Sequence, residues 1–210
     1  KGMSTWTPTN ANGSFSGDSI PLKSAFAKSI NSVAVRLGQE LGIKNIIETA
    51  QKMGIESPLD DNPALALGSS DVNLLELAGA YCTIANNGMH HRPTLVTRIV
   101  DSDGNEVFVD KSTSEQVIPY KSAFFMQKLL MSGTHDGGGT SVSLSAAEYA
   151  GNSFRDTDWG GKTGTTNNHS DAWFVGVSPN LVVGAWVGGE YRSIHFRTGA
   201  LGQGARTALP

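Results

Sequence analysis

The stretch Lys162-Thr163-Gly164-Thr165-Thr166 stands shortly before two apolar runs, residues 172–178 and 181–188, with Pro179 and Asn180 between them. In the first run apolar and small residues alternate, as a strand with two different faces requires. Runs of this length around a Pro-Asn turn predict a hairpin. The segment 160–166 predicts a further strand. We therefore expect a sheet over residues 160–188 that carries the Lys-Thr-Gly sequence.

Upstream of these strands, apolar residues follow the three-to-four residue spacing of amphipathic helices. The spacing begins near Pro21, after an irregular segment over residues 1–20, and polar residues interrupt it at Ser29 and Asn31. Residues of this type favour turns over helix interiors. The pattern predicts a helix–loop–helix with Ser29 and Asn31 in the joint.

The rest of the chain combines helical and strand patterns. Asn73 and Glu76 resemble a capping box at the start of a helix, and Asp-Gly at residues 103–104 predicts the turn of a hairpin. We expect residues 1–93 and 121–132 to be mainly helical, 94–109 to form a hairpin, and 160–188 to form strands. This is an α/β (α+β) fold, in which an antiparallel sheet packs against helices beside a helical lobe.

Two features that could suggest chemistry have plainer structural interpretations. Gly137-Gly138-Gly139 lacks the spacing of a phosphate-binding loop, and we interpret it as a flexible linker. Cys82 is the only cysteine, which excludes an internal disulfide. Because it lies among apolar residues at helical spacing, we expect it to be a buried core thiol.

Composition excludes several functional classes. The 210 residues carry a net charge of −3, which gives no basic face for nucleic acid. No apolar run approaches the roughly 20 residues that span a bilayer. The histidines show no metal-ligand spacing, so we expect no metal site.

The Lys-Thr-Gly strand has the groups that acyl transfer to or from a peptide requires. Lys162 supplies positive charge, and the hydroxyls of Thr163 and Thr165 can bind a terminal carboxylate. Gly164 removes bulk where a substrate backbone would approach, and a free strand edge can pair with a peptide. Side chains alternate along a strand, so Lys162 and Gly164 point one way and the two threonines the other.

The ordered set of Ser29-Ile30-Asn31, Lys162-Thr163-Gly164 and the segment from Asp171 resembles the transpeptidase domain of penicillin-binding proteins. Trp6-Thr-Pro-Thr-Asn10 and Ala64-Leu-Ala-Leu-Gly68 make it most similar to the bifunctional, class A members. The resemblance covers essentially the whole chain. It implies the penicillin-binding protein and serine β-lactamase type of fold, incomplete at its N-terminal end.

The resemblance also implies roles for these residues. Ser29, Asn31 and Lys162 would be catalytic, with Lys162 and Ser29 hydrogen-bonded across the cleft and Asn31 on an amide of the donor peptide. Thr163, Gly164, Thr165 and Thr166 would bind substrate. The Thr165 N–H would form half of the oxyanion hole. The resemblance implies neither a metal nor an organic cofactor.

The nucleophile of this family lies in a Ser-x-x-Lys motif, and no serine of this chain has lysine three positions later. Ser24 and Lys28 are four apart, in the helix that leads to Ser29. We therefore expect the motif to lie N-terminal to Lys1, in a remainder of the same domain that would be a partner of this chain. The chain alone is expected to be inactive.

The activity that the resemblance implies is D,D-transpeptidation: a serine is acylated by a peptidoglycan stem peptide, and the acyl group passes to an amine on a neighbouring stem. β-Lactam antibiotics would acylate the same serine. We expect a periplasmic or extracytoplasmic location, with membrane contact only through an anchor outside this chain. Two alternatives are a D,D-carboxypeptidase or β-lactamase, in which water accepts the acyl group, and a non-catalytic remnant or binding scaffold.

Overall fold

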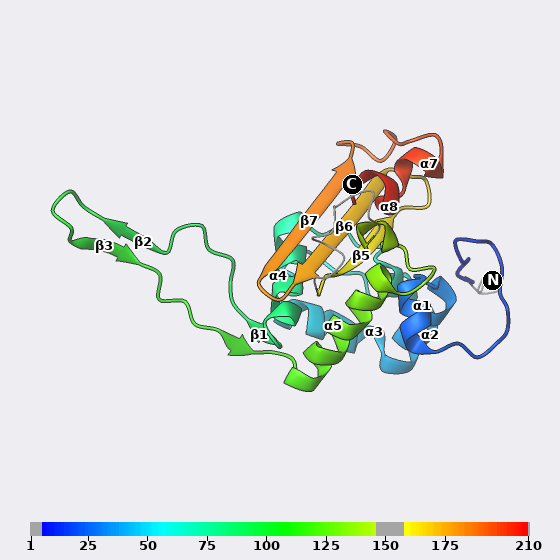
Figure 1. Cartoon of the computed structure of the whole chain (residues 1–210), viewed down its shortest axis with the longest axis horizontal. Helices are drawn as coiled ribbons and strands as arrows, with labels where there is room; N and C mark the ends of the chain where they lie inside the picture. Colours follow the sequence, from blue (N-terminus) through cyan, green and yellow to red (C-terminus); the bar gives the residue numbers. More distant parts are fainter. Residues whose placement is uncertain (1–5, 146–157, 210) are drawn as a thin grey trace.

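A three-stranded antiparallel sheet forms the centre of the molecule (Figure 1). The computed structural model describes residues 6–145 and 158–209. In the sheet, β5 (Gly160–Thr165) pairs with β6 (Asp171–Ser178), which pairs with β7 (Leu181–Gly188). The predicted hairpin is confirmed, with Ser178 opposite Leu181. Within the described residues, β5 is an edge strand of this sheet.

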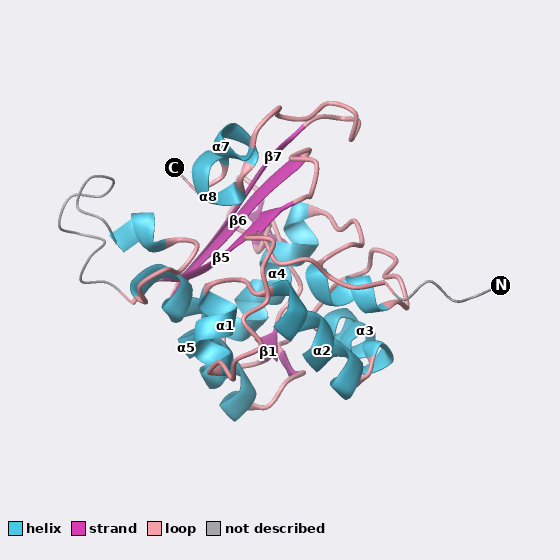
Figure 2. Ribbon diagram, turned by 90° about the vertical axis from the view of Figure 1, so that its right-hand side faces the viewer, coloured by secondary structure: helices cyan, strands magenta, loops and turns pink. Residues whose placement is uncertain are grey.

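Helices cover both faces of the sheet (Figure 2). On one face, Val177 packs with Ile84 of α4 (Leu74–Ala85) and Leu130 of α5 (Tyr120–His135). On the other face, Phe174 packs with Ala208, directly after α8 (Gly204–Thr207). The alternation along β6 separates these two clusters. The predicted antiparallel sheet packed with helices is confirmed.

A group of helices lies beside the sheet. It comprises α1 (Leu22–Ala27), α2 (Asn31–Leu41), α3 (Ile43–Lys52) and the 3-10 helix η1 (Pro63–Leu67). α2 packs against both α3 and η1. The predicted helix–loop–helix is confirmed, with Ser29 in the joint between Ala27 and α2. Asn31, also predicted in the joint, is instead the first residue of α2.

A long hairpin extends away from the helices and the sheet (Figure 1). β2 (Arg98–Val100) pairs with β3 (Glu106–Val109), as the Asp-Gly turn predicts. The Asp101 carboxylate accepts hydrogen bonds from the backbone N–H groups of Asp103 and Asn105, which closes the turn. A second pair, β1 (Met89–His90) and β4 (Glu115–Gln116), lies at the base of the hairpin.

The structure confirms one helix start and corrects a burial prediction on the same helix. Asn73 Oδ1 accepts a hydrogen bond from Glu76 N over 2.9 Å at the start of α4. Cys82, predicted to be buried, is exposed. The buried stripe of α4 consists of Gly79, Ala80, Thr83 and Ile84, and Cys82 lies outside it.

The triple glycine is not a flexible linker. It forms a tight turn between α5 and the 3-10 helix η2 (Val142–Ser145), in which Gly139 N donates to Asp136 O. A Cβ at Gly139 would lie only 2.4 Å from Gly133 O, so the turn requires glycine there. The C-terminal segment contains α7 (Gly199–Gly202) before α8. No helix among the described residues is long and apolar enough to cross a membrane.

Candidate active site

Ser29 lies in the joint between α1 and α2 in a left-handed backbone conformation, with φ of +53°. Ser29 N donates to Phe26 O and Ile30 N to Ala25 O, both over 3.0 Å. This pair of bonds is the Schellman arrangement that ends many helices, usually with glycine at the left-handed position. Serine there costs about 1 kcal/mol or more. The joint therefore holds the backbone of Ser29 in a strained conformation, which fixes the position of its side chain.

Asn31 is the first residue of α2, and the N-terminal segment holds it in place. Its Nδ2 donates to Thr9 O over 2.7 Å. The next residue of that segment, the buried Asn10, accepts a hydrogen bond from Ser32 N over 3.1 Å through its Oδ1. Asn10 thus supplies a cap to α2, which has no side-chain cap of its own.

Lys162 joins the β5 strand to the joint between α1 and α2. Its Nζ donates to Ser29 Oγ and to the backbone oxygen of Thr163, each over 2.8 Å. Burial of its ammonium lowers the pKa of Lys162 from 10.5 to about 8. A lysine of this kind can gain or lose a proton near neutral pH. The hydrogen bond to Ser29 is the one that the family resemblance implied.

Thr163 and Thr165 point away from Lys162, as strand alternation requires. Thr163 Oγ1 donates a hydrogen bond over 2.8 Å to Oγ1 of Thr140, in the turn after the triple glycine. Thr165 Oγ1 accepts a hydrogen bond from Gly204 N at the start of α8, which leaves its own hydrogen free to donate.

Gly164 lies between these threonines in close packing. A Cβ at Gly164 would lie 3.0 Å from Trp173 Cβ. A Cβ at Gly204 would lie 2.3 Å from Gly164 O, so α8 approaches the β5 backbone closely.

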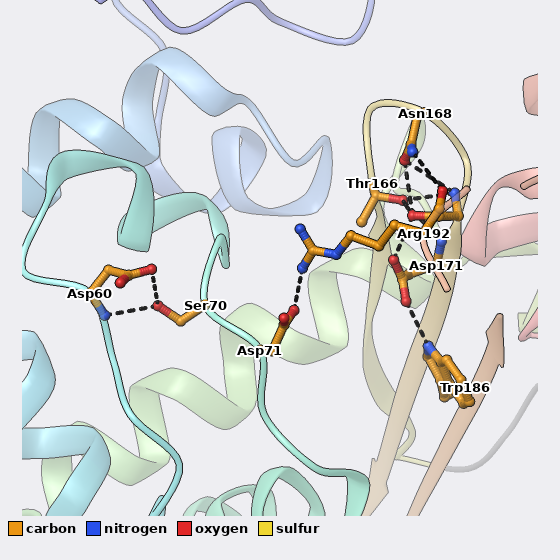
Figure 3. A network of polar contacts seen from close by, with 9 residues as sticks. Asp60, Ser70, Asp71, Thr166, Asn168, Asp171, Trp186 and Arg192 are labelled. Carbon is orange, nitrogen blue, oxygen red and sulfur yellow. Dashed lines mark hydrogen bonds and ion pairs between the residues drawn. The ribbon is translucent and has the colours of Figure 1, made fainter. Parts of the chain in front are cut away.

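Thr166 belongs to the turn between β5 and β6 (Figure 3). Its Oγ1 accepts hydrogen bonds from Ser170 N over 3.0 Å and from Asp171 N over 2.9 Å. Asp171 in turn accepts a bond from Trp186 Nε1 on β7 over 3.0 Å. The Thr166 hydroxyl therefore stabilises this turn, whereas Lys162 contacts Ser29.

Two connections near this turn link it to the rest of the molecule. Arg192 extends to the carboxylate of Asp71, in the segment before α4 (Figure 3). His169 also has a left-handed backbone, with φ of +60°, and its ring packs against Gly199 and Gly202 of α7. Among the described residues, no three His, Cys, Asp or Glu side chains are grouped to hold a metal ion.

The sequence patterns did not identify Asn10, Thr140 or Gly204 as neighbours of the site. Each contacts a motif residue, or its neighbour, from a distant part of the chain. Asn10 belongs to the Trp-Thr-Pro-Thr-Asn segment on which the family resemblance rests. The resemblance therefore marks the segment, but it does not predict that Asn10 caps α2. Thr140 and Gly204 have no comparable sequence signal.

A Lys-Thr-Gly strand that is hydrogen-bonded to a Ser-x-Asn segment at the end of a helix is the arrangement of two of the three motifs of active-site serine acyltransferases. The sheet with helices on both faces agrees with that class. Comparison with known sequences gives the family: the penicillin-binding protein transpeptidase domain matches residues 1–187. The chain belongs to this family.

Curated relatives are class A penicillin-binding proteins. The chain is 34% identical over 192 residues to penicillin-binding protein 2D of Bacillus subtilis, and this match covers 90% of the chain. It is also 34% identical over 203 residues to penicillin-binding protein 1B of Haemophilus influenzae, covering 96% of the chain. The matches cover only 27% and 25% of those two relatives. The chain thus spans about a quarter of the length of the relatives it matches.

Solved structures confirm the fold. Penicillin-binding protein 1A from Haemophilus influenzae superposes with a TM-score of 0.85 and 26% identity, covering 99% of this chain and 35% of that protein. The PonA1 protein from Mycobacterium tuberculosis, in complex with penicillin V, gives a TM-score of 0.73 at 25% identity. That match covers 94% of this chain and 55% of PonA1.

Proposed function

We propose that this chain forms the substrate-binding wall of a D,D-transpeptidase that cross-links peptidoglycan stem peptides through a serine acyl-enzyme. The observation that carries the proposal is the 2.8 Å hydrogen bond from Lys162 Nζ to Ser29 Oγ. It brings the two motifs together in a chain that belongs to the transpeptidase family. The protein would act outside the cytoplasm, on the cell wall.

Each motif residue has a role in the proposed reaction. Lys162, with its lowered pKa, would exchange a proton with the Ser29 hydroxyl as the acyl group transfers. Asn31 would contact an amide of the donor stem through its side chain. Thr163 and Thr165 would bind the terminal carboxylate of the stem or of a β-lactam. The Thr165 N–H, on the edge strand, would donate to the oxyanion.

The proposed roles of Gly164 and Thr166 follow from their places beside these groups. Gly204 lets α8 pack closely against the backbone of β5 at Gly164, and Gly164 itself leaves room for Trp173 of β6. The Thr166 hydroxyl accepts hydrogen bonds from backbone N–H groups of the β5–β6 turn. Thr166 would therefore contact substrate only where the substrate reaches the C-terminal end of β5. Both would act on substrate mainly through the shape of β5.

The acylated serine would come from a Ser-x-x-Lys segment outside these 210 residues, because no serine in the sequence fits that motif. An amine of a neighbouring stem peptide would then accept the acyl group.

Intact mass spectrometry with benzylpenicillin tests this proposal. We expect no adduct on the 210-residue chain, and an adduct of one antibiotic mass on the full-length gene product. Lys162→Ala in that product should slow acylation at least tenfold, since it removes the proton-exchanging group, whereas the exposed Lys44→Ala should not. A folded full-length protein without adduct would contradict the proposal. An adduct on the 210-residue chain would show that the nucleophile lies within it.

The lifetime of the adduct separates the proposed reaction from its nearest alternative. A transpeptidase has no efficient route for water to reach the acyl-enzyme, so the adduct should persist for hours. Loss of the adduct within seconds, with release of hydrolysed antibiotic, would identify a hydrolase on the same fold.

A further inference from the structure

Thr140 contacts both elements that carry the site motifs. Its Oγ1 accepts a hydrogen bond over 2.8 Å from Thr163 Oγ1 on β5. Its backbone N donates over 3.1 Å to the oxygen of Ala27, the last residue of α1, two positions before Ser29. Thr140 thus links the Lys-Thr-Gly strand to the helix that ends at the Ser-x-Asn joint.

The turn around Thr140 is fixed on both sides. Before it, Gly139 N donates to Asp136 O, and the Asp136 carboxylate forms an ion pair with Lys23 of α1 over 2.9 Å. After it, the fully buried Ser141 donates from its backbone N to Gly133 O of α5. These bonds restrict the backbone of Thr140, so its hydroxyl reaches Thr163 without further ordering.

The two hydroxyls are constrained by how many hydrogens they have. Each can donate one hydrogen bond and accept two. In the structure, Thr163 gives its hydrogen to Thr140 and so has none left for a carboxylate. When a carboxylate is bound, Thr163 must donate to it, and the bond between the two threonines then requires Thr140 as donor. In such a chain each bond polarises the next and strengthens it.

We propose that Thr140 is a positioning residue for carboxylate binding: when a carboxylate binds, the bond between the two threonines reverses, and Thr140 donates to Thr163 while Thr163 donates to the carboxylate. The inference rests on the proposed function, in which Thr163 binds that carboxylate. It predicts that Thr140 affects only those substrates and antibiotics that carry a free carboxylate. A role in packing alone would affect all of them equally.

The test compares Thr140→Val with Thr140→Ser in the full-length protein. Valine keeps the size of threonine and removes the hydroxyl, whereas serine keeps the hydroxyl. The measurement is the second-order rate of acylation by benzylpenicillin and by its methyl ester, which lacks the free carboxylate. Thermal unfolding of each variant shows whether it is folded.

We expect Thr140→Val to slow acylation by benzylpenicillin about five- to tenfold, the size of one lost hydrogen bond. With the methyl ester, the variant and the wild type should react within twofold of each other. Thr140→Ser should stay within about twofold of wild type with both compounds. In a Thr163→Val background, Thr140→Val should have no further effect, because the hydroxyl on which it acts is gone.

An equal loss with the acid and the ester would overturn the proposal and leave Thr140 a packing residue. So would a Thr140→Val protein that benzylpenicillin acylates at the wild-type rate. If the wild-type full-length protein is not acylated at all, the proposed function itself is wrong, and the role of Thr140 is wrong with it. If benzylpenicillin acylates the wild type and Thr140→Val at the same rate, only the proposed role of Thr140 is wrong, and the proposed function stands.

Discussion

Lys162 Nζ donates a hydrogen bond to Ser29 Oγ over 2.8 Å, although the two residues are 133 positions apart. The serine has a left-handed backbone, and the lysine is desolvated; each condition alone is unfavourable. The bond gives the buried ammonium a partner and fixes the direction of the serine side chain. The site thus combines two unfavourable features, and the rest of the fold stabilises them.

Ser29→Gly and Ser29→Ala should differ in stability, although both remove the hydroxyl that accepts from Lys162. Glycine adopts a φ of +53° without strain, whereas alanine retains the strain. We expect Ser29→Gly to exceed Ser29→Ala by about 1 kcal/mol in the free energy of unfolding, measured with urea. Equal values, or a more stable alanine variant, would show that the joint is not strained.

Lys162→Met should change how stability depends on pH. The lysine has a pKa of about 8 in the folded chain and 10.5 as its ordinary value. Well above pH 10.5 the amine is neutral in both states, and its burial costs little. As the pH falls toward 8, the unfolded chain binds a proton that the folded chain does not, so wild-type stability is lost.

The curves of unfolding free energy against pH for the wild type and for Lys162→Met should therefore converge or cross as the pH rises. Relative to Lys162→Met, wild type should gain on the order of 3 kcal/mol between pH 8 and pH 10.5, at 1.36 kcal/mol per unit. Other groups that titrate in this range are present in both proteins and cancel in the difference. Urea unfolding at several pH values measures it, and parallel curves would contradict the lowered pKa of Lys162.

Sequence patterns located the parts of the site that depend on local signals. The interruption at Ser29 and Asn31 marks the joint, because polar turn-forming residues break a clear helical period there. The alternation from residue 172 to 178 gives the two faces of β6. Both signals come from neighbours within a few positions, where the chain's own geometry decides the structure.

Contacts between distant segments left no such signal. The bond between Thr140 and Thr163 spans 23 positions, and nothing local distinguishes this threonine from others. The apolar residues of α4 surround most of the helix, so the buried stripe that excludes Cys82 is set by α5 and β7. α7 and α8 have four residues each, too few for a recognisable period.

Gly139→Ala and Gly137→Ala test whether the triple glycine is a packed turn. An alanine Cβ at Gly139 would lie 2.4 Å from Gly133 O, so the backbone must shift. No atom lies within 4 Å of a Cβ at Gly137. We expect a loss of about 1–3 kcal/mol in the free energy of unfolding for Gly139→Ala, and no loss for Gly137→Ala. Equal effects on the urea midpoint would support a flexible linker instead.

Asn10 should stabilise α2 from outside the helix. Its Oδ1 accepts from Ser32 N in the first turn of α2, and its Nδ2 donates to Ser14 O. Asn10→Ala removes the acceptor, and we expect a loss of about 1 kcal/mol in the free energy of unfolding. Asn10→Asp keeps that acceptor and adds negative charge at the helix N-terminus, which is favourable, so it should lose less.

Hydrogen exchange at the Ser32 amide separates capping from a general loss of packing. The amide should exchange faster in Asn10→Ala than in Asn10→Asp, while amides of α5 stay equally protected in both. Because Asn31 donates to Thr9 O beside this cap, faster exchange should also accompany greater mobility of the Asn31 side chain amide. If Asn10→Asp exchanges as fast as Asn10→Ala, the acceptor at Asn10 does not hold the start of α2, and Asn31 must be positioned by other contacts.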